Sequence, residues 1–404
     1  MSSAISPTQP VPSEAEPHGL FEKLSSLDGT LLSPEERRRA LERFFRLRSG
    51  REKPGHFWKV DFESIAPDAD SIDLTETNIT VENPNSGLLV CDLATAARMQ
   101  PELFARAFGT TGVAATKFGA LASAFCGLGV FIYARADYAA DEPIVVRYDA
   151  PAGAAIFPWS VVLAERGARL TVVERLAGGA GAFICGAAEL VTEEHADVTF
   201  ASVQQIGDGA RAIFTHAARP GRDAAISWAL AELGGQLAAG DLTVSIDHPG
   251  SQTSITGLFF PRSTQHVDLV STVDHRAGEA TSETVIKSAA TEKGQARFLG
   301  NIRIAPHAQG SDARLRDDAL LLSTTAHVDS VPALEIGAND VKAYHGATVG
   351  AIDVEQVFYM ETRGIERAAA ERMIALGFFE PAIERFPSTN LRDEIRAALA
   401  AKLS

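Results

Sequence analysis

Histidine and cysteine are the residues of this sequence best suited to metal chemistry, and one histidine has an unusual context. His345 lies in "DVKAYHGATVG", residues 340–350, with no second histidine or cysteine beside it. Neutral imidazole is a common ligand for iron, copper and zinc. A lone imidazole supplies one bond, so His345 is either a structural histidine or one ligand of a metal site shared between two chains.

The other histidines of the central region are scattered, and we expect most of them to be surface or hydrogen-bonded residues. His195 lies in the charged turn "EEHA" and is predicted to be exposed. The remaining six are His216, His248, His266, His275, His307 and His327.

Three cysteines are present, and they form no CxxC pair. This excludes a disulfide framework, and it excludes a cysteine-ligated zinc or stable iron–sulfur site built by this chain alone. Cys126 lies in the apolar segment "SAFCGLGVFIY", so we expect it to be a buried small residue. The other two are Cys91 and Cys185.

No catalytic motif stands out. The sequence contains no GxxxxGK[ST], HExxH or GxSxG pattern. Its carboxylates have no diagnostic spacing, although the two acids of a glycosidase can be distant in sequence. Two alternatives therefore stay open: a β-helix enzyme acting on a carbohydrate polymer, and a homodimeric interaction protein without a metal role.

Composition narrows the class further. The chain has 404 residues and a net charge of −15, which argues against a general nucleic-acid binder. Residues 1–17 have no signal-peptide pattern and predict a disordered Pro/Ser/Glu tail. No apolar run reaches the ~20 residues of a membrane span, so we expect a cytoplasmic protein that does not bind membranes.

Between Lys117 and Ile336 the chain consists of short apolar pieces rich in Val, Ile, Phe and Thr, which predict strands. Terse turns separate them, and three turns end 14 residues apart at Ala196, Ala210 and Ala224. Many short strands fit a sandwich, a barrel or a solenoid. The length and the recurring spacing favour a β-solenoid.

Helices are expected on both sides of the strands. Ser33 and Glu36 form a capping box for a helix that ends near Gly50, and "QPELFARAFG" predicts a helix ending at Gly109. After residue 352, Asp353 caps one helix, and a second is predicted to stop at Gly377. We expect these helical regions to cover the solenoid ends, because open edges invite association. The predicted units are a tail (1–17), an N-terminal helical region (18–112), a β core (113–352) and a C-terminal helical region (353–404).

The segment "DVKAYHGATVGAIDVEQVFYMETRGI" closely resembles the C-terminal signature of the SufB/SufD family, scaffolds of the SUF system of iron–sulfur cluster assembly. The upstream segments "KFGALASAFCGLGVFIYARADYAADEPIVV" and "FLGNIRIAPHAQGSDARLRDDALLLSTTAHVDSVPALEIGANDVKA" also resemble it. The likeness extends from about residue 115 to residue 386. The cysteine-poor C-terminal half and the modest length favour the SufD branch.

The resemblance implies a mainly β protein, a right-handed parallel β-helix between helical regions. It also implies a non-catalytic scaffold subunit of a three-protein complex with a SufB-like subunit and the ABC-type ATPase SufC. Such a subunit binds no cofactor stably by itself and holds a transient Fe–S cluster in the complex. The resemblance leaves open whether a homodimer competes with the heterodimer and whether a flavin binds the complex.

The resemblance also implies site residues. By position, His345 is the histidine that faces the SufB-like partner, where it would act as a transient iron ligand shared with that partner. A neutral imidazole binds iron, so cluster assembly should weaken as the pH falls. The ATPase-docking segment corresponds to Phe358, Tyr359, Arg363, Gly364 and Ile365.

Two residues beside His345 depart from the family pattern. Ala343 stands where a cysteine is common, so this chain offers a nitrogen ligand there but no sulfur. Tyr344 stands where a small residue is usual, and its ring would alter access to the histidine.

Overall fold

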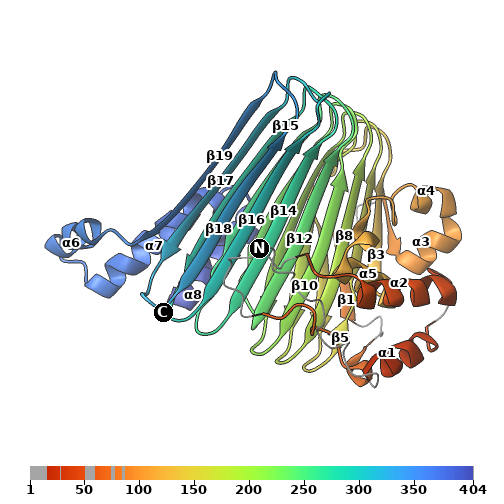
Figure 1. The fold of residues 1–404 in the computed structure, drawn as a ribbon, viewed down its shortest axis with the longest axis horizontal. Coiled ribbons are helices and arrows are strands. Elements are labelled where there is room, and N and C mark those ends of the chain that lie inside the picture. Colours follow the sequence, from red (N-terminus) through yellow and green to blue (C-terminus); the bar gives the residue numbers. More distant parts are fainter. Residues whose placement is uncertain (1–15, 28, 51–59, 74–77, 84–86, 404) are drawn as a thin grey trace, which may run out of the picture.

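The computed structural model describes residues 16–27, 29–50, 60–73, 78–83 and 87–403. Almost all of the predicted tail lies outside these residues. The described chain is dominated by two long sheets that face each other and form a β-solenoid, as predicted (Figure 1). Among the described residues, no helix combines the length and hydrophobicity needed to cross a membrane.

The chain alternates between the two sheets, so that most neighbouring strands within a sheet are parallel and one coil apart. The ten-stranded sheet contains β2 (Leu88–Asp92), β3 (Gly129–Ala134), β5 (Ala155–Ile156), β6 (Trp159–Ala164), β8 (Phe183–Thr192), β10 (Arg211–Arg219), β12 (Leu237–Ile246), β14 (His266–His275), β16 (Gln295–Ile304) and β18 (His327–Ile336). The nine-stranded sheet contains β1 (Ile79–Glu82), β4 (Ile144–Ala150), β7 (Arg169–Gly178), β9 (Asp197–Ile206), β11 (Ala225–Glu232), β13 (Gln252–Phe259), β15 (Thr281–Ala290), β17 (Asp312–Leu321) and β19 (Lys342–Ala351).

The alanines that end the turns explain the 14-residue spacing. Ala196, Ala210 and Ala224 are fully buried, or nearly so, where the chain passes from one sheet to the other. The N–H of each donates to the carbonyl three residues earlier, which closes a tight turn. Each half-coil therefore spans about 14 residues in this region, and the small side chain fits inside the corner.

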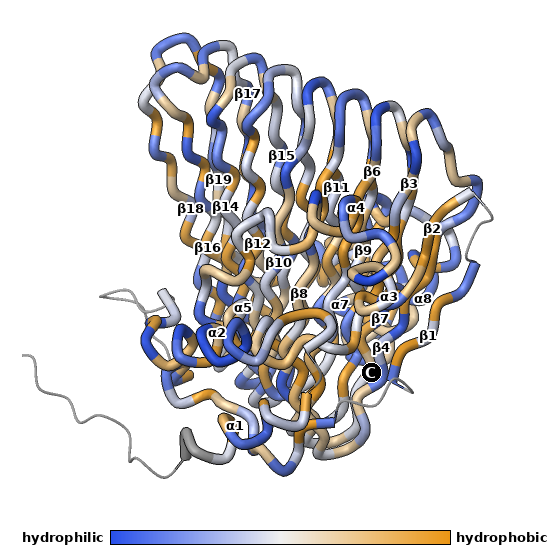
Figure 2. Tube along the Cα trace, turned by 90° about the vertical axis from the view of Figure 1, so that its right-hand side faces the viewer, coloured by the Kyte–Doolittle hydropathy of each residue, from blue (hydrophilic) through white to orange (hydrophobic). Residues whose placement is uncertain are grey.

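A row of left-handed residues runs along one rim of the solenoid. The residue just before the buried turn position has a positive φ in successive coils, with values from 52° at Asp223 to 75° at Gly250. The N–H of His195 donates to Arg222 O, and the N–H of Asp223 donates to Pro249 O, each in the next coil. We call this row the turn ladder: Asp137, Gly167, His195, Asp223, Gly250, Glu279 and Gly310. Figure 2 shows hydrophilic residues gathered at the turns and hydrophobic residues along the strands.

The N-terminal end of the solenoid is covered. Strands β1 and β2 pair antiparallel with β4 and β3, which ends the parallel stacking. Residues of α2 and of the buried α5 share a hydrophobic core with the outer face of the ten-stranded sheet. The helical segments of this region are α1 (Glu16–Leu24), α2 (Pro34–Arg46), η1 (Ala69–Ser71), α3 (Leu93–Met99), α4 (Pro101–Ala105), η3 (Val113–Ala115) and α5 (Lys117–Phe125).

The N-terminal helices differ in extent from the prediction. The capping box of Ser33 and Glu36 is confirmed, but α2 ends at Arg46 rather than near Gly50. Helix α4 ends at Ala105, well before Gly109. Helix α5 occupies a stretch that the sequence placed among the strands; all of its residues are buried, so it lacks the amphipathic pattern that marks a surface helix.

The C-terminal helices are α6 (Val354–Thr362), α7 (Arg367–Ile383) and α8 (Thr389–Leu403). The predicted stop at Gly377 is wrong, since α7 continues because Phe379 and Ile383 are buried against the nine-stranded sheet. Helix α8 adds Leu391 and Ile395 to the same cluster. These two helices therefore cover the outer face of that sheet, and the expectation that they cover the solenoid end is wrong (Figure 1).

Candidate functional site at the open end of the solenoid

At the C-terminal end of the solenoid, side-chain positions that are buried in the earlier coils become exposed. Strands β18 and β19 are the last of their sheets and pair on one side only, with β16 and β17. Ile336 is in register with the buried Ile304, yet 43% of Ile336 is exposed. Val349 is in register with the buried Ala319 and is 45% exposed. Exposed apolar side chains beside unpaired strand edges are typical of a surface that another chain covers.

His345 lies in the middle of β19, not at the end of its strand, and faces the solenoid interior. Its register partner is Leu315, which is 1% exposed. Each strand below places a buried side chain at the same position, so His345 is the first exposed member of an inward-facing column. The buried members are Ile144, Val172, Phe200, Trp228, Ile255, Thr284 and Leu315.

The neighbours of His345 divide between the two faces of β19. Ala343 is in register with the buried Ala313, so it shares the inward face with His345. Tyr344 is in register with the exposed Arg314, so its ring lies on the outer face and does not cover the histidine. A cysteine at position 343 would therefore lie on the same face as the imidazole.

The cysteines that are present lie in the N-terminal half, far along the chain from His345. Cys126 and Cys185 are buried, as predicted for Cys126. Burial raises the pKa of Cys126 to about 11, and it also raises the pKa of Cys185. Thiols of this kind are poor nucleophiles and poor metal ligands.

Asp317 is a lumen-facing acid near the open end. It is 0% exposed and lies in register between the buried Ile286 and Ala347 of the last coil. Its Oδ2 accepts a hydrogen bond from Ser330 Oγ, across the lumen on β18. Its Oδ1 has no hydrogen-bond partner among the described residues. Burial raises the pKa of Asp317 to about 7.

A second polar group of lumen residues lies deeper, around Glu174. The Glu174 carboxylate accepts hydrogen bonds from Ser160 Oγ (2.7 Å) and Ser202 Oγ (3.2 Å). Burial raises the pKa of Glu174 to about 7; burial and the nearby Glu174 charge raise that of Glu232 to about 8. Because no sequence pattern distinguishes these acids from surface acids, they could not be predicted.

His216 lies beside this group. Its ring stacks on Phe214 and Trp228, with centroids 4.5 and 5.2 Å away, and burial lowers its pKa to about 3. A cavity of only about 10 Å³ is lined by Glu174 and His216 among others. That volume holds a single water at most, so the cavity beside Glu174 and His216 is too small for a ligand.

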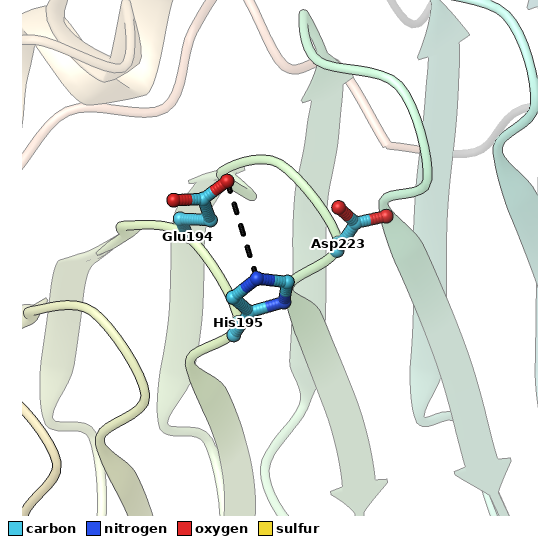
Figure 3. A group of neighbouring side chains, drawn as sticks. All are labelled: Glu194, His195 and Asp223. Carbon is cyan, nitrogen blue, oxygen red and sulfur yellow. Dashed lines mark ion pairs between the residues drawn. The ribbon is translucent and has the colours of Figure 1, made fainter.

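His195 belongs to an exposed cluster on the turn ladder (Figure 3). Its Nε2 lies 4.0 Å from Glu194 Oε1, and one ligand atom each from Glu194, His195 and Asp223 all lie within 4.8 Å of one another. The prediction that His195 is a surface residue is confirmed. By contrast, His216, His266 and His275 are buried, and His275 Nε2 bonds to Ser282 Oγ at 2.8 Å.

The predicted ATPase-docking residues lie on α6, which projects away from the solenoid (Figure 1). Phe358 and Tyr359 are 68% and 60% exposed, although they are large apolar side chains. The Arg363 guanidinium lies 5.2 Å from the Tyr359 ring centroid and donates to its hydroxyl. Val357 is buried on the other face and anchors the helix.

Gly364 and Ile365 have a structural role at the end of α6. Gly364 has a φ of +82°, and its N–H donates to Glu361 O. The N–H of Ile365 donates to Met360 O, which completes a Schellman motif. These two residues therefore fix where the helix stops, while Phe358 and Tyr359 provide its exposed surface.

A shallow groove of about 380 Å³ lies on the outer face of the nine-stranded sheet, and it bears on the carbohydrate alternative. Its lining includes Ser254, Glu283 and Asp312. Glu283 pairs with Arg385 at 2.7 Å, and Asp312 pairs with Arg314 at 2.9 Å. The hydrogen bond and charge of Arg314 lower the pKa of Asp312, whereas the general acid of a glycosidase has a raised pKa.

Comparisons with known proteins point to one family. A family model described as "SUF system FeS cluster assembly, SufBD core domain" matches residues 146–378. The iron–sulfur cluster assembly protein SufD of Escherichia coli is 34% identical over 171 residues, which cover 42% of this chain and 40% of that protein. SufD of Bacillus subtilis is 25% identical over 334 residues, covering 81% of this chain and 76% of that protein. A SufBD family protein of Mycobacterium tuberculosis is 28% identical over 319 residues, covering 76% and 78%.

Proposed function

The chain belongs to the SufBD core-domain family of the SUF system, and on that premise we propose that it is a scaffold subunit for iron–sulfur cluster assembly. It pairs with a SufB-like subunit, docks a SufC-like ABC ATPase and works in the cytoplasm. It catalyses no reaction by itself. The observation that carries the proposal is the exposed His345, placed in the lumen column where the solenoid lacks a further coil.

The open end supports the pairing. The last coil leaves the edges of both sheets unpaired and exposes Ile336 and Val349 at core positions. A second β-helix that stacks on this end would pair both edges and bury both side chains at once. A second copy of this chain could make the same contact, so a homodimer competes with the heterodimer at one surface.

The position of His345 supports a transient metal role. In such an interface the imidazole faces the partner, and Ala343 beside it leaves room for partner thiolates. One nitrogen ligand from this chain holds the nascent cluster less tightly than a four-cysteine cage would. Weak binding suits a scaffold, because the cluster is cargo that has to leave. Flavin binding by the assembled complex stays a prediction.

Helix α6 supports the ATPase contact. Phe358 and Tyr359 expose aromatic surface on an element that projects from the solenoid, and Val357 holds the helix in place. Aromatic residues and arginine are enriched at protein interfaces. Movements of a docked ATPase would therefore be transmitted through α6, which follows directly after β19 and its histidine.

Anaerobic reconstitution of the co-expressed three-protein complex tests the proposal. The cluster's visible absorbance is compared between the wild type and His345→Ala. The matched control is His195→Asn, which removes an exposed imidazole and tolerates the left-handed backbone. We expect intact complexes in all cases and a strong loss of cluster only in His345→Ala. Equal cluster yields would show that His345 is dispensable and overturn the proposal.

A further inference from the structure

Asp317 presents an unpaired oxygen inside the solenoid, one coil from the open end. Its side chain is 0% exposed, and within the part of the chain that the structure describes only Oδ2 has a hydrogen-bond donor, Ser330 Oγ. A buried polar atom without a partner costs on the order of 1–3 kcal/mol. Such an atom calls for an explanation, because buried polar groups are normally paired.

The nearby charges do not explain it. The charge of Lys287 acts to lower the pKa of Asp317, but Lys287 forms its own ion pair with Asp318 at 2.8 Å. Lys287 and Asp318 are in register with each other and lie on the opposite strand face from Asp317. The lumen side of Asp317 therefore receives one hydroxyl and no cation from the described residues.

Asp317 and His345 share the inward face of the sheet, on neighbouring strands. Asp317 is on β17 directly below Ala347, and His345 precedes Ala347 by two residues on the same inward face. Strand spacing and rise place the two Cα atoms roughly 8 Å apart. Ala347 carries only a methyl group above Asp317, and no further coil formed by the described residues covers this position. An ion at the open end can thus lie between the carboxylate and the imidazole.

We propose that Asp317 and His345 together form a binding site for one ferrous ion at the open end of the lumen. This inference deepens the proposed function, on which it rests. A carboxylate oxygen and an imidazole nitrogen suit divalent first-row metals such as Fe²⁺. Binding transfers any proton on Asp317 to solvent, and both ligands then donate electron pairs to the ion. The remaining coordination positions stay open for sulfide and partner thiolates, so iron binds here before the cluster is complete.

Calorimetric titration of the full chain with Co²⁺, a spectroscopically convenient substitute for Fe²⁺, tests the inference. We expect one site in the wild type, and at least a tenfold loss of affinity in both Asp317→Asn and His345→Ala. Asp317→Asn retains a side-chain oxygen for Ser330 and matches the carboxylate in size, so its fold should survive. The control is Asp312→Asn, an acid on the outer face of the same strand, which should leave affinity unchanged.

The outcomes separate this inference from the proposed function. If Asp317→Asn binds Co²⁺ as the wild type does, or if the wild type binds none, the two-residue site is wrong. The proposed function is tested separately, by the cluster yield of the complex that contains His345→Ala. A thermal melt of Asp317→Asn distinguishes ligand loss from misfolding, because removing a buried acid should preserve or raise the melting temperature.

Discussion

His345 lies one coil above Leu315 at the same inward-facing position, so one lumen column ends in a core leucine followed by an exposed imidazole. The backbone that positions the imidazole is therefore set by the packing of the coils below it. The histidine itself contributes little to that packing. This separation of scaffold and site makes their roles testable independently.

Leu315→Ala should destabilise the solenoid by about 2–5 kcal/mol, because it opens a cavity in the buried column. His345→Ala removes an exposed side chain and should change stability by no more than about 0.5 kcal/mol. Urea unfolding followed by circular dichroism measures both. A large stability loss in His345→Ala would show that the histidine is a structural residue.

Ala343→Cys should strengthen metal retention, because it places a thiol on the same strand face as His345. Tyr344→Cys is the matched control, since its thiol would lie on the outer face beside Arg314. We expect the reconstituted complex with Ala343→Cys to release its cluster more slowly to a chelator. Equal slowing in both variants would contradict the assignment of faces.

Glu232→Gln should remove part of the pH dependence of stability. Burial and Glu174 raise the pKa of Glu232 from 4.5 to about 8, so the folded state binds a proton that the unfolded state releases. The contribution is complete below pH 4.5 and is lost as the pH rises towards 8, and it amounts to on the order of 5 kcal/mol. Urea midpoints between pH 5 and pH 8 should fall for the wild type and stay flatter for Glu232→Gln.

The control for this measurement is Glu142→Gln, an exposed acid that should leave the pH profile of the wild type unchanged. His216 has the opposite effect on the pH dependence of stability, because burial lowers its pKa from 6.5 to about 3. Its contribution to stability is complete above pH 6.5 and is lost as the pH falls towards 3. A fall in the urea midpoint between pH 5 and pH 8 that is as steep in Glu232→Gln as in the wild type would contradict the assignment of a neutral Glu232.

Phe358→Ala should weaken capture of the SufC-like ATPase at least tenfold without changing the stability of the chain, because Phe358 is 68% exposed. Gly364→Ala should also weaken capture, but through strain: its φ of +82° costs an alanine about 1 kcal/mol, which frays α6. Phe45→Ala, an exposed aromatic on α2, is the control. Surface binding measurements with the purified ATPase would detect the difference.

The solenoid could be predicted because its turns place small residues at a regular spacing in the sequence. Ala196, Ala210 and Ala224 are small for a geometric reason, and strands of β-branched residues fill the intervals. The surface on which the C-terminal helices pack could not be predicted. Gly377 resembles a helix stop, but Phe379 and Ile383 beyond it bury against the outer sheet face, and that tertiary packing outweighs the local signal.

The site was predictable only in part. The family resemblance identified His345, but not that Ala343 shares its face while Tyr344 does not. Asp317 and Asp318 are adjacent and both buried, one in the lumen and one on the outer face paired with Lys287. Because α7 and α8 also cover the outer face over the second half of these strands, polar–apolar alternation does not reveal which acid points inward.

The turn ladder also makes the length of the molecule adjustable only in whole steps. The backbone N–H groups of six ladder residues donate to carbonyls of the next coil, and a one-residue slip would turn every lumen side chain outwards. An insertion or deletion of a complete coil would instead leave each column intact and shift the two ends relative to each other by one strand spacing. An inserted coil would thus keep the same terminal surface and lengthen the distance between it and the N-terminal helices by one strand spacing.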